Sequence, residues 1–293
     1  MAYSALANKA QTLEVLKSHG LYTKYRLGQN FLINDTVIGK ILSLSEVAAT
    51  DVVLEIGPGI GTLSLALLQN AEALCSIEQD KDLVPVLADT LSDYQSSFTL
   101  INQDALKTSK KDILYAFEKL PVHSELPNKL ISNLPYQIAA TVILLYFQEF
   151  DFLDSMTVMV QSEVADRISA HISSKAYGAY TAKLSLYASV KGRFQVSAQN
   201  FFPPPRVESA VIKLVRNSQD KFSLTKEEKL EVCKVIDAAF LQRRKTIRNS
   251  MSQNYPKDML DEAFKRAEIN PGLRAETLDA QAFVRLAYHL KTL

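Results

Sequence analysis

The sequence has little that would anchor the chain in a membrane or cross-link it. Its 293 residues include no apolar run approaching the ~20 residues that span a bilayer. The amino terminus lacks the apolar core of a secretion signal. Only two cysteines are present, Cys75 and Cys233, and they lie far apart in the sequence. We therefore expect buried free thiols in a cytoplasmic protein that makes no membrane contact.

Metal ligands and an excess of one charge are also missing. The histidines are scattered without the spacing of metal ligands, and the two cysteines do not pair with them, so no metal site is predicted. The histidines are His19, His123, His171 and His289. Net charge is only +1, which does not advertise nucleic-acid binding. The distribution of charge is more informative than its total.

Basic residues gather in two places. Lys24 and Arg26 belong to a basic stretch near the start, and a second cluster comprises Arg243, Arg244, Lys245 and Arg248. Either cluster suits phosphate binding, and either is equally typical of a solvated basic helix end.

A strand–helix alternation begins near residue 51 and predicts an α/β fold. Short apolar segments that read as strands cover residues 52–56, 73–77, 98–101, 130–132 and 156–160. Helical segments separate most of them, which predicts a parallel sheet covered on both faces. A later alternating segment, 207–215, could close the sheet as an antiparallel neighbour.

The pattern changes after residue 216. Residues 217–223 read as a polar linker, and residues 225–228 (Thr-Lys-Glu-Glu) form a capping box that opens an amphipathic helix. Further helical patterns surround residues 257–267 and 280–290. We therefore predict two domains, 1–216 with the α/β fold and 217–293 as a small all-helical domain.

A glycine-rich turn follows the first predicted strand. Residues 55–61 read Glu-Ile-Gly-Pro-Gly-Ile-Gly, with glycines at Gly57, Gly59 and Gly61. Glycine lets the backbone turn tightly and approach a ligand closely. The spacing differs from the G-x-G-x-x-G of nicotinamide-binding folds, and an acid precedes the first glycine. Both points favour S-adenosylmethionine, although a nicotinamide dehydrogenase remains a third-ranked alternative.

Polar residues end the next two strands. Glu78 ends the second, where an acid suits a bidentate hydrogen bond to ribose hydroxyls. Asp104 ends the third, where it could accept from an adenine amino group or simply cap the turn before Ala105. Because ligands of open parallel sheets bind at the carboxyl ends of strands, the series of strand ends predicts one site.

The fourth strand ends in Asn133-Leu134-Pro135-Tyr136. This pattern suits alkylation of an exocyclic amino group, whose lone pair is delocalised into an aromatic ring. A side-chain amide oxygen and a backbone carbonyl can accept its two N–H bonds and favour a tetrahedral nitrogen in the transition state. Proline shapes the turn, and tyrosine offers a face for stacking. A plain strand followed by a proline turn is the alternative interpretation.

Taken together, these motifs resemble the ribosomal small-subunit adenine dimethyltransferase family over nearly the whole chain, from Leu27 onward. Residues 27–32, 55–61, 103–105 and 133–136 are similar to the family's motifs in order and spacing. So are the aromatic–proline segment 201–209 and the basic segment 240–250. The chain departs from the usual pattern at residues 137–139, Gln-Ile-Ala, which affects only local contacts.

The resemblance implies a Rossmann-like S-adenosylmethionine-dependent methyltransferase that dimethylates N6 of two adjacent adenosines near the 3′ end of 16S rRNA in the small ribosomal subunit. It implies cofactor contacts from Asn30, Leu32, Gly57, Glu78, Asp104 and Asn133. Asn133 with the Leu134–Pro135 backbone would hold the amine. Tyr136 and Phe201, or its neighbour Phe202, would sandwich the flipped base.

Two other functions stay open at this point. A macrolide-resistance methyltransferase of large-subunit rRNA uses similar motifs, and a non-catalytic RNA-binding assembly factor could share the fold. The helical tail with residues 242–246 favours the small-subunit enzyme, and the intact cofactor and amine motifs argue against loss of catalysis. Nothing in the sequence indicates an obligate dimer, so we expect a monomer.

Overall fold

The computed structural model describes the chain except for residues 1, 22–29, 119, 123–125, 219–220 and 292–293. The chain divides into two compact units. The first comprises Met1–Ala165 and Val190–Val215, and the second comprises Asp166–Ser189 and Arg216–Leu293. In this division the segment 166–189 belongs with the carboxyl-terminal helices.

The first unit is built on a mixed sheet whose order is β4-β3-β2-β5-β6-β9-β7 within the described residues. Strands β2 to β6 are parallel neighbours, and β9 runs antiparallel to β6. Their bounds are β2 Val52–Ile56, β3 Ala73–Glu78, β4 Phe98–Asn102, β5 Lys129–Asn133, β6 Ser155–Gln161, β7 Ala188–Val196 and β9 Ser209–Arg216. The predicted parallel sheet with an antiparallel closing strand is confirmed, while β7 was not predicted.

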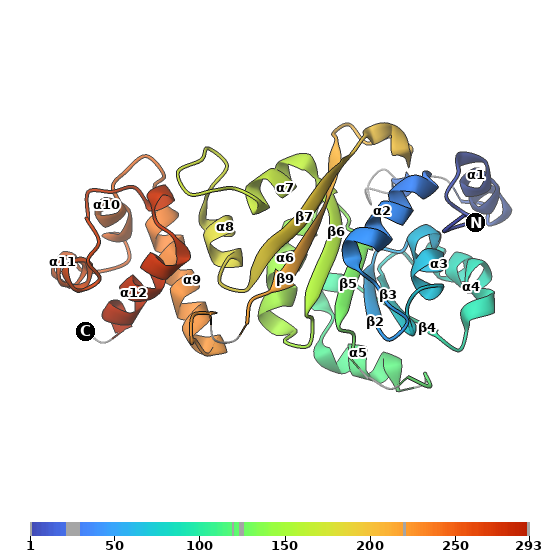
Figure 1. Cartoon of the computed structure of the whole chain (residues 1–293), viewed down its shortest axis with the longest axis horizontal. Coiled ribbons are helices and arrows are strands. Elements are labelled where there is room, and N and C mark those ends of the chain that lie inside the picture. The colour runs from blue at the N-terminus through green and yellow to red at the C-terminus, as the bar shows by residue number, and fades with distance from the viewer. Residues whose placement is uncertain (1, 22–29, 119, 123–125, 219–220, 292–293) are drawn as a thin grey trace. The chain divides into compact units, whose positions relative to one another are not determined.

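One face of this sheet packs on helices α2 (Asp35–Ser45) and α3 (Thr62–Leu68) (Figure 1). A single buried cluster joins residues of both helices to one residue from each of six strands of this sheet: Val53, Leu74, Ile131, Met159, Val211 and Val196. Side chains alternate along a strand, so these residues share a face. Burial of this face fixes the register and therefore the positions of the strand ends.

The remaining helices of the first unit are α1 (Lys9–Ser18), α4 (Val84–Thr90), α5 (Lys110–Phe117), α6 (Ala139–Glu149) and the start of α7 (Ser162–Ile168). On α6, the Tyr146 hydroxyl donates to the Ala105 carbonyl oxygen at 2.9 Å. Burial raises the pKa of this tyrosine well above its usual range, so the phenol stays neutral. The hydrogen bond from Tyr146 to Ala105 connects α6 to the turn that follows β4.

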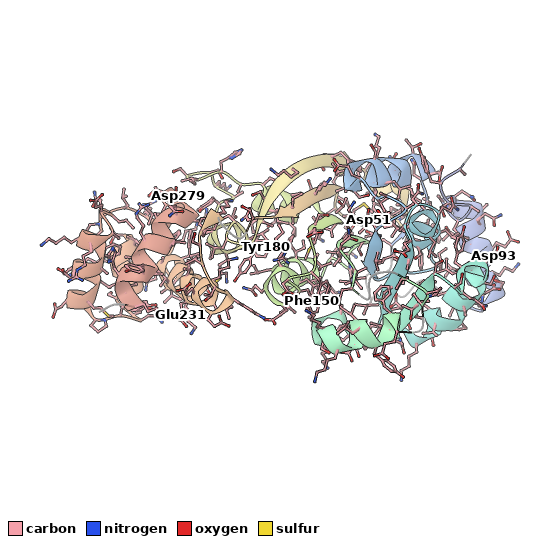
Figure 2. All side chains as sticks on the ribbon, turned by 60° about the horizontal axis from the view of Figure 1, so that its bottom comes forward. Asp51, Asp93, Phe150, Tyr180, Glu231 and Asp279 are labelled. Atoms are coloured by element: carbon pink, nitrogen blue, oxygen red, sulfur yellow. The ribbon has the colours of Figure 1, made fainter. Side chains whose placement is uncertain are left out.

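An ion pair and a hydrogen bond join the amino ends of strands β2 and β5. Asp51, which Figure 2 labels just before β2, accepts from the Lys129 ammonium at 2.7 Å and the Asn128 amide at 2.6 Å. Lys129 and Asn128 lie at the start of β5. The starts of β2 and β5 are thereby held in register, and their carboxyl ends lie side by side at the other edge.

A small second sheet was also not predicted. Strands β1 (Phe31–Leu32) and β8 (Phe201–Phe202) pair antiparallel, with Leu32 opposite Phe201. Phe31 joins a buried cluster with Leu16 of α1 and with Ile60 and Leu83. The amino-terminal helix therefore packs beside the turn that follows β2.

The second unit is helical over most of its length. It contains α8 (Ala179–Leu184), α9 (Lys226–Phe240), α10 (Ile247–Met251), α11 (Lys257–Arg266) and α12 (Ala280–Lys291); Figure 2 labels Glu231 on α9 and Asp279 just before α12. The predicted capping box is confirmed, since Thr225 and Glu228 cap α9 reciprocally. Among the described residues, no helix has both the length and the apolar character needed to cross a bilayer.

Candidate active site

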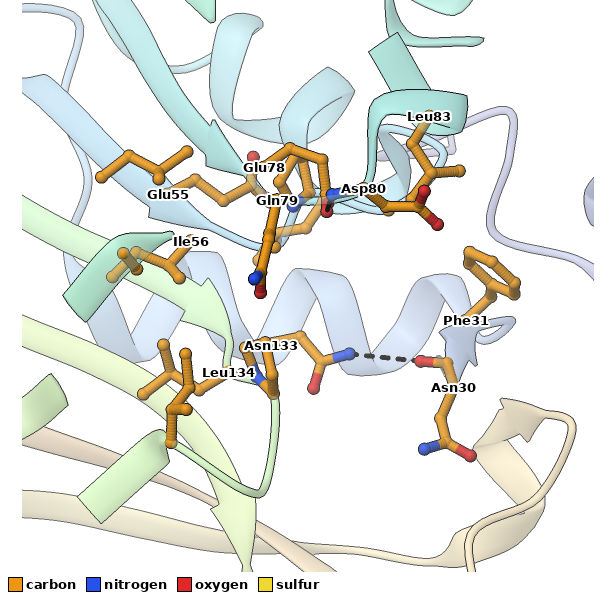
Figure 3. Close-up of a pocket in the computed structure, with 18 of the residues that line it drawn as sticks. Asn30, Phe31, Glu55, Ile56, Glu78, Gln79, Asp80, Leu83, Asn133 and Leu134 are labelled. Carbon is orange, nitrogen blue, oxygen red and sulfur yellow. Dashed lines mark hydrogen bonds between the residues drawn. The ribbon is translucent and has the colours of Figure 1, made fainter. Parts of the chain in front are cut away.

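A pocket opens at the carboxyl ends of β2, β3, β4 and β5 (Figure 3). It encloses about 160 Å³ and is lined by segments from four strand ends and from β1. Of the predicted site residues, the pocket brings together Asn30, Leu32, Gly57, Gly59, Glu78, Asn133, Leu134, Pro135 and Tyr136. One cavity thus joins the glycine-rich turn to the Asn-Leu-Pro-Tyr segment, as the parallel topology requires.

The glycines of the turn are needed for backbone conformation and for space. Gly57, Gly59 and Gly61 have φ values of 69°, 61° and 88°, in the left-handed region. A Cβ at Gly57 would lie 3.2 Å from Pro135 Cγ, and one at Gly59 would lie 3.2 Å from Phe31 Cε1. The turn therefore packs closely on Pro135 and Phe31, and a side chain at Gly57 or Gly59 would crowd these two pocket residues.

Glu78 presents a carboxylate to the pocket from the end of β3. Only 8% of the residue is exposed, and one carboxylate oxygen accepts the Asp80 N–H at 2.8 Å. Burial raises the pKa of Glu78, while the backbone N–H groups of Asp80, Gly59 and Gln79 oppose that rise. The carboxylate is oriented by the backbone, as a group that binds paired hydroxyls needs to be.

Glu55, the acid before the first glycine, stabilises the elements that flank the turn. Its carboxylate is 1% exposed and accepts from Ser64 Oγ at 2.6 Å and Ser76 Oγ at 3.0 Å. Burial raises its pKa from 4.5 to about 7. The two serines come from α3 and β3, so Glu55 links the helix and strand on either side of the turn.

Asn133 and its neighbours form a fixed turn. The Asn133 side-chain nitrogen lies 3.4 Å from the carbonyl oxygen of Asn30 (Figure 3). The Leu134 N–H donates to Met159 O at 3.1 Å, which extends the β5–β6 ladder by one bond. Ile138 N–H donates to Pro135 O at 3.1 Å and closes the turn. The amide side chain of Asn133 therefore has a defined orientation at the carboxyl end of β5.

Tyr136 lines the pocket beyond the proline. The residue is half-buried, and burial raises its pKa. Its hydroxyl lies 2.5 Å from Ser209 Oγ. The ring is therefore held at its hydroxyl end by the first residue of β9.

Three predicted site residues lie outside the pocket lining. Asp104 accepts from Leu106 N at 2.9 Å and caps a short 3₁₀ turn, which was the alternative interpretation, while its neighbours Gln103 and Ala105 line the pocket. Gly61 supports the turn from behind, against Thr90. Phe201 is only 2% exposed and belongs to the buried cluster beneath α2 and α3. Of the two phenylalanines, it is Phe202 that is half-buried.

The predicted RNA-binding residues divide into two kinds. Arg243 donates to the Lys175 carbonyl and pairs with Glu276, and Arg248 pairs with Asp261, with Nη2 2.6 Å from Oδ2. Arg244 and Lys245 are exposed. Lys24 and Arg26 lie outside the described residues. Within the second unit, Arg243 and Arg248 form ion pairs with carboxylates of the same unit, whereas Arg244 and Lys245 face solvent.

Sequence reasoning missed several pocket residues, of which Thr62 is the most informative. Thr62 lines the pocket, and its side-chain oxygen is buried with no hydrogen-bond partner among the described residues. Such an atom is costly unless a ligand or water satisfies it. Phe31, Asp80 and Leu83 also line the pocket. Adjacency to Gly61 and Glu78 could have indicated Thr62 and Asp80, whereas Phe31 and Leu83 arrive only through tertiary packing.

These features fit S-adenosylmethionine. The glycines of the turn allow a ligand to approach the backbone closely. The Glu78 carboxylate, fixed by a backbone donor, offers a partner for hydroxyl groups, and the buried Thr62 hydroxyl offers a further polar contact. The described residues contain no group of three or more His, Cys, Asp or Glu side chains suited to a metal ion.

Comparison with solved structures gives the fold class. A dimethyladenosine transferase from Plasmodium falciparum superposes with a TM-score of 0.71 at 22% identity, covering 87% of this chain and 95% of that one. The 23S rRNA methyltransferase ErmE superposes with a TM-score of 0.64 at 22% identity, covering 89% of this chain and 100% of that one. These likenesses show that the chain has the same Rossmann-like fold.

Sequence comparison gives the family. A family model described as ribosomal RNA adenine dimethylase matches residues 20–292. Proteins named ribosomal RNA small subunit methyltransferase A are 39% identical in Clostridium botulinum strain Langeland and 37% identical in Enterococcus faecalis. These matches cover 94% and 99% of this chain, and 97% of each relative. The chain belongs to the ribosomal RNA adenine dimethylase family, and it is an S-adenosylmethionine-dependent rRNA adenine dimethyltransferase.

Proposed function

We propose that this enzyme dimethylates N6 of two adjacent adenosines in a hairpin loop near the 3′ end of 16S rRNA, during assembly of the small ribosomal subunit. The observation that carries the proposal is the contact between the two halves of the pocket. The Gly57 turn lies against Pro135, with 3.2 Å between an ideal Cβ and Pro135 Cγ. A donor held on that turn and an amine held by the Asn133 segment would therefore be neighbours.

Asn133 and the Leu134 backbone would hold the amine. Because the Asn133 nitrogen is directed at Asn30 O, the amide oxygen is the end available to accept one N–H. Pro135 O already closes a turn with Ile138, so the Leu134 carbonyl is the better acceptor for the other N–H. Accepting both bonds favours a tetrahedral nitrogen and directs its lone pair away from the ring, which helps most in the transition state.

Stacking would hold the base itself. Tyr136 offers one face, and Phe201 or Phe202 of the aromatic–proline segment offers the other; the half-buried ring of Phe202 supports the second choice. Loop adenosines are cheaper to unstack than paired ones, which suits a flipped base. After the first methylation the amine has one N–H left, so the site must admit a rotated, bulkier nitrogen.

The donor would be held by residues on both sides of the turn. We assign Glu78 to the ribose hydroxyls, Thr62 to a polar contact, and Asn30, Leu32, Gly57, Gly59 and Asn133 to the walls. Gly61 would shape the turn, and Asp104 would act through the Gln103–Ala105 backbone. When bound, S-adenosylmethionine supplies an electrophilic methyl group on a positively charged sulfur. The attacked nitrogen becomes strongly acidic and can release its proton to water, so the chain need not provide a general base.

The rest of the chain would bind the rRNA. Exposed Arg244 and Lys245 suit phosphate contacts in the second unit, with Arg243 and Arg248 supporting them, and Lys24 and Arg26 are proposed for the same role. We assign catalysis to domain 1–216 and RNA recognition to domain 217–293. We propose that the enzyme acts in the cytoplasm as a monomer, without a membrane or metal requirement.

Methyl transfer to purified subunits tests the proposal. The wild-type enzyme, tritiated S-adenosylmethionine and undermethylated small or large subunits are combined, and the labelled nucleosides are identified. We expect N6,N6-dimethyladenosine at neighbouring positions of the small-subunit RNA only. Label in large subunits would instead indicate the macrolide-resistance activity. Absence of label together with tight binding to small subunits would indicate a non-catalytic assembly factor.

A further inference from the structure

A hydrogen bond connects the Asn-Leu-Pro-Tyr segment to the aromatic–proline segment of the chain. The Tyr136 hydroxyl and Ser209 Oγ are 2.5 Å apart, although 73 positions separate the two residues. Tyr136 lines the pocket, whereas Ser209 does not. Ser209 therefore reaches the site only through the tyrosine.

Ser209 is held firmly by its surroundings. The residue is 0% exposed and is the first residue of β9, where it pairs with Gln161 of β6. The adjacent backbone is tied as well, since Ser162 N–H donates to Glu208 O at 2.9 Å. The Gln195 amide, oriented so that its nitrogen faces Ser209 O, donates to it at 2.9 Å. The serine hydroxyl is thus carried by a residue whose backbone is fixed by the sheet and does not belong to a loop.

Tyr136, in contrast, lies in the turn beyond the last residue of β5. Its ring direction depends on two side-chain torsions, and a hydroxyl fixed at the far end of the ring restricts both. A stacking surface that is already oriented spends less of its binding free energy on ordering when the base arrives. Removing this bond would leave the ring in place but free to reorient.

We infer that Ser209 is a positioning residue for methyl transfer, which holds the Tyr136 ring at the angle that the target adenine requires. The inference rests on the proposed stacking role of Tyr136. It gives the serine of the aromatic–proline segment a function distinct from that of the phenylalanines in the same segment. Ser209 contacts neither the methyl donor nor the base.

The inference predicts a particular kinetic signature. Ser209→Ala should lower kcat for methylation of the rRNA acceptor about tenfold, while the Kd for S-adenosylmethionine stays within about twofold, since a preorganised orientation acts on turnover more than on cofactor affinity. Tyr136→Phe keeps the ring and removes the same bond, so it should lose a similar factor. The double variant should lose no more than either single variant, because both changes break one interaction.

Two further variants separate positioning from stability. Ser209→Thr retains the hydroxyl on a side chain suited to a strand, and it should recover most of the lost turnover. Ser45→Ala removes a serine of similar burial, 1% exposed, whose hydroxyl donates to Leu42 O at 2.9 Å within α2. It should match Ser209→Ala in its change of Tm while leaving kcat unchanged.

The variants are assayed on whichever subunit accepts methyl groups from the wild-type enzyme, so a wrong acceptor in the proposed function shows in the wild-type measurement alone. Wild-type turnover in Ser209→Ala would overturn the inference. Additive losses in the double variant would do so too, because the two residues would then act separately. Equal loss of turnover in Ser45→Ala would assign the effect to stability.

Discussion

The side-chain nitrogen of Asn133 points at the main-chain carbonyl oxygen of Asn30, 3.4 Å away (Figure 3). An amide has one donor end and one acceptor end, so this contact decides which end remains for a ligand. The donor end is used within the protein, and the oxygen is left to accept. The residue just before β1 thereby orients a side chain that lies 103 positions further along the chain.

The first prediction follows from that polarity. Asn133→Ala should lower kcat about a hundredfold or more, the usual cost of losing one preorganised group that acts in the transition state. Asn133→Asp should lower kcat at least as much, because a carboxylate oxygen would then face the carbonyl oxygen of Asn30. The rate is measured by methyl transfer to subunits, with S-adenosylmethionine affinity measured by calorimetry. An alanine variant with a tenth or more of wild-type activity would contradict the proposed role.

A second prediction concerns the contact between the glycine turn and the proline. Gly57→Ala combines a φ of 69° with a Cβ 3.2 Å from Pro135 Cγ, so it should weaken cofactor binding and slow turnover together. Gly20→Ala is the matched control, since its φ is 64° but no atom of the described residues lies within 4 Å of the Cβ that alanine would add. Both changes should cost about 1–2 kcal/mol of folding stability from the backbone alone. Only Gly57→Ala should alter kcat, and equal kinetic effects would show that backbone strain explains both.

A third prediction separates the two phenylalanines of β8. Phe201 is 2% exposed in the core, so Phe201→Ala should destabilise the fold by about 3–5 kcal/mol. Phe202 is half-buried, with the Lys9 ammonium 5.2 Å from its ring centroid. Phe202→Ala should keep a near-normal Tm and lose about tenfold in kcat/KM for RNA. The opposite pattern, with activity lost at Phe201 and Tm intact, would assign base stacking to Phe201.

The fourth prediction divides the basic cluster. Replacing Arg244 and Lys245 by alanine should weaken subunit binding and flatten the dependence of log K on log salt by up to about one unit for each phosphate that the variant no longer binds. Arg243→Ala should lower Tm instead, because it breaks bonds to Glu276 and the Lys175 carbonyl. Binding titrations over a salt series, alongside thermal unfolding, distinguish the two effects. Equal salt slopes in the wild type and the double variant would exclude phosphate binding by these two side chains.

The fifth prediction is a pH dependence that comes from Glu55. Burial raises its pKa from 4.5 to about 7 in the folded state, so the folded protein keeps a proton that the unfolded chain releases. Its stabilising effect is complete below pH 4.5 and is lost as the pH rises towards 7, a change of about 3 kcal/mol.

Glu55→Gln retains an acceptor for Ser64 and Ser76 and has no such proton. The stability of Glu55→Gln relative to wild type should therefore increase between pH 4.5 and 7 and then level off. Urea unfolding at several pH values measures this difference. A difference that does not change with pH would show that Glu55 is ionised throughout.

Much of this fold was predictable because its signals are local. The chain passes from the buried strand 52–56 to the glycine turn within ten residues, and β2 occupies the same residues in the structure. The site residues at strand ends could be grouped because parallel topology brings all such ends to one edge. The capping box at Thr225 and Glu228 is likewise a pattern of four consecutive residues.

What could not be predicted depends on partners far away in sequence. The two-residue strands β1 and β8 exist only because Leu32 and Phe201 meet in the folded core. Arg248 looks like any other exposed cation until Asp261 is placed beside it. Asp104 is a different case, because its side chain accepts from Leu106 N and forms the cap that the sequence had left open as one of two roles.

The second compact unit is assembled from two separate stretches of chain, and this has a consequence for synthesis on the ribosome. Tyr177 donates to Leu278 O at 2.9 Å, and Lys183 pairs with Asp237 at 2.8 Å. These early residues emerge well before their partners, and domains generally complete folding only when all their residues are available. Segment 166–189 therefore lacks its packing partners until translation has almost ended. A chain truncated at residue 216 would never supply them.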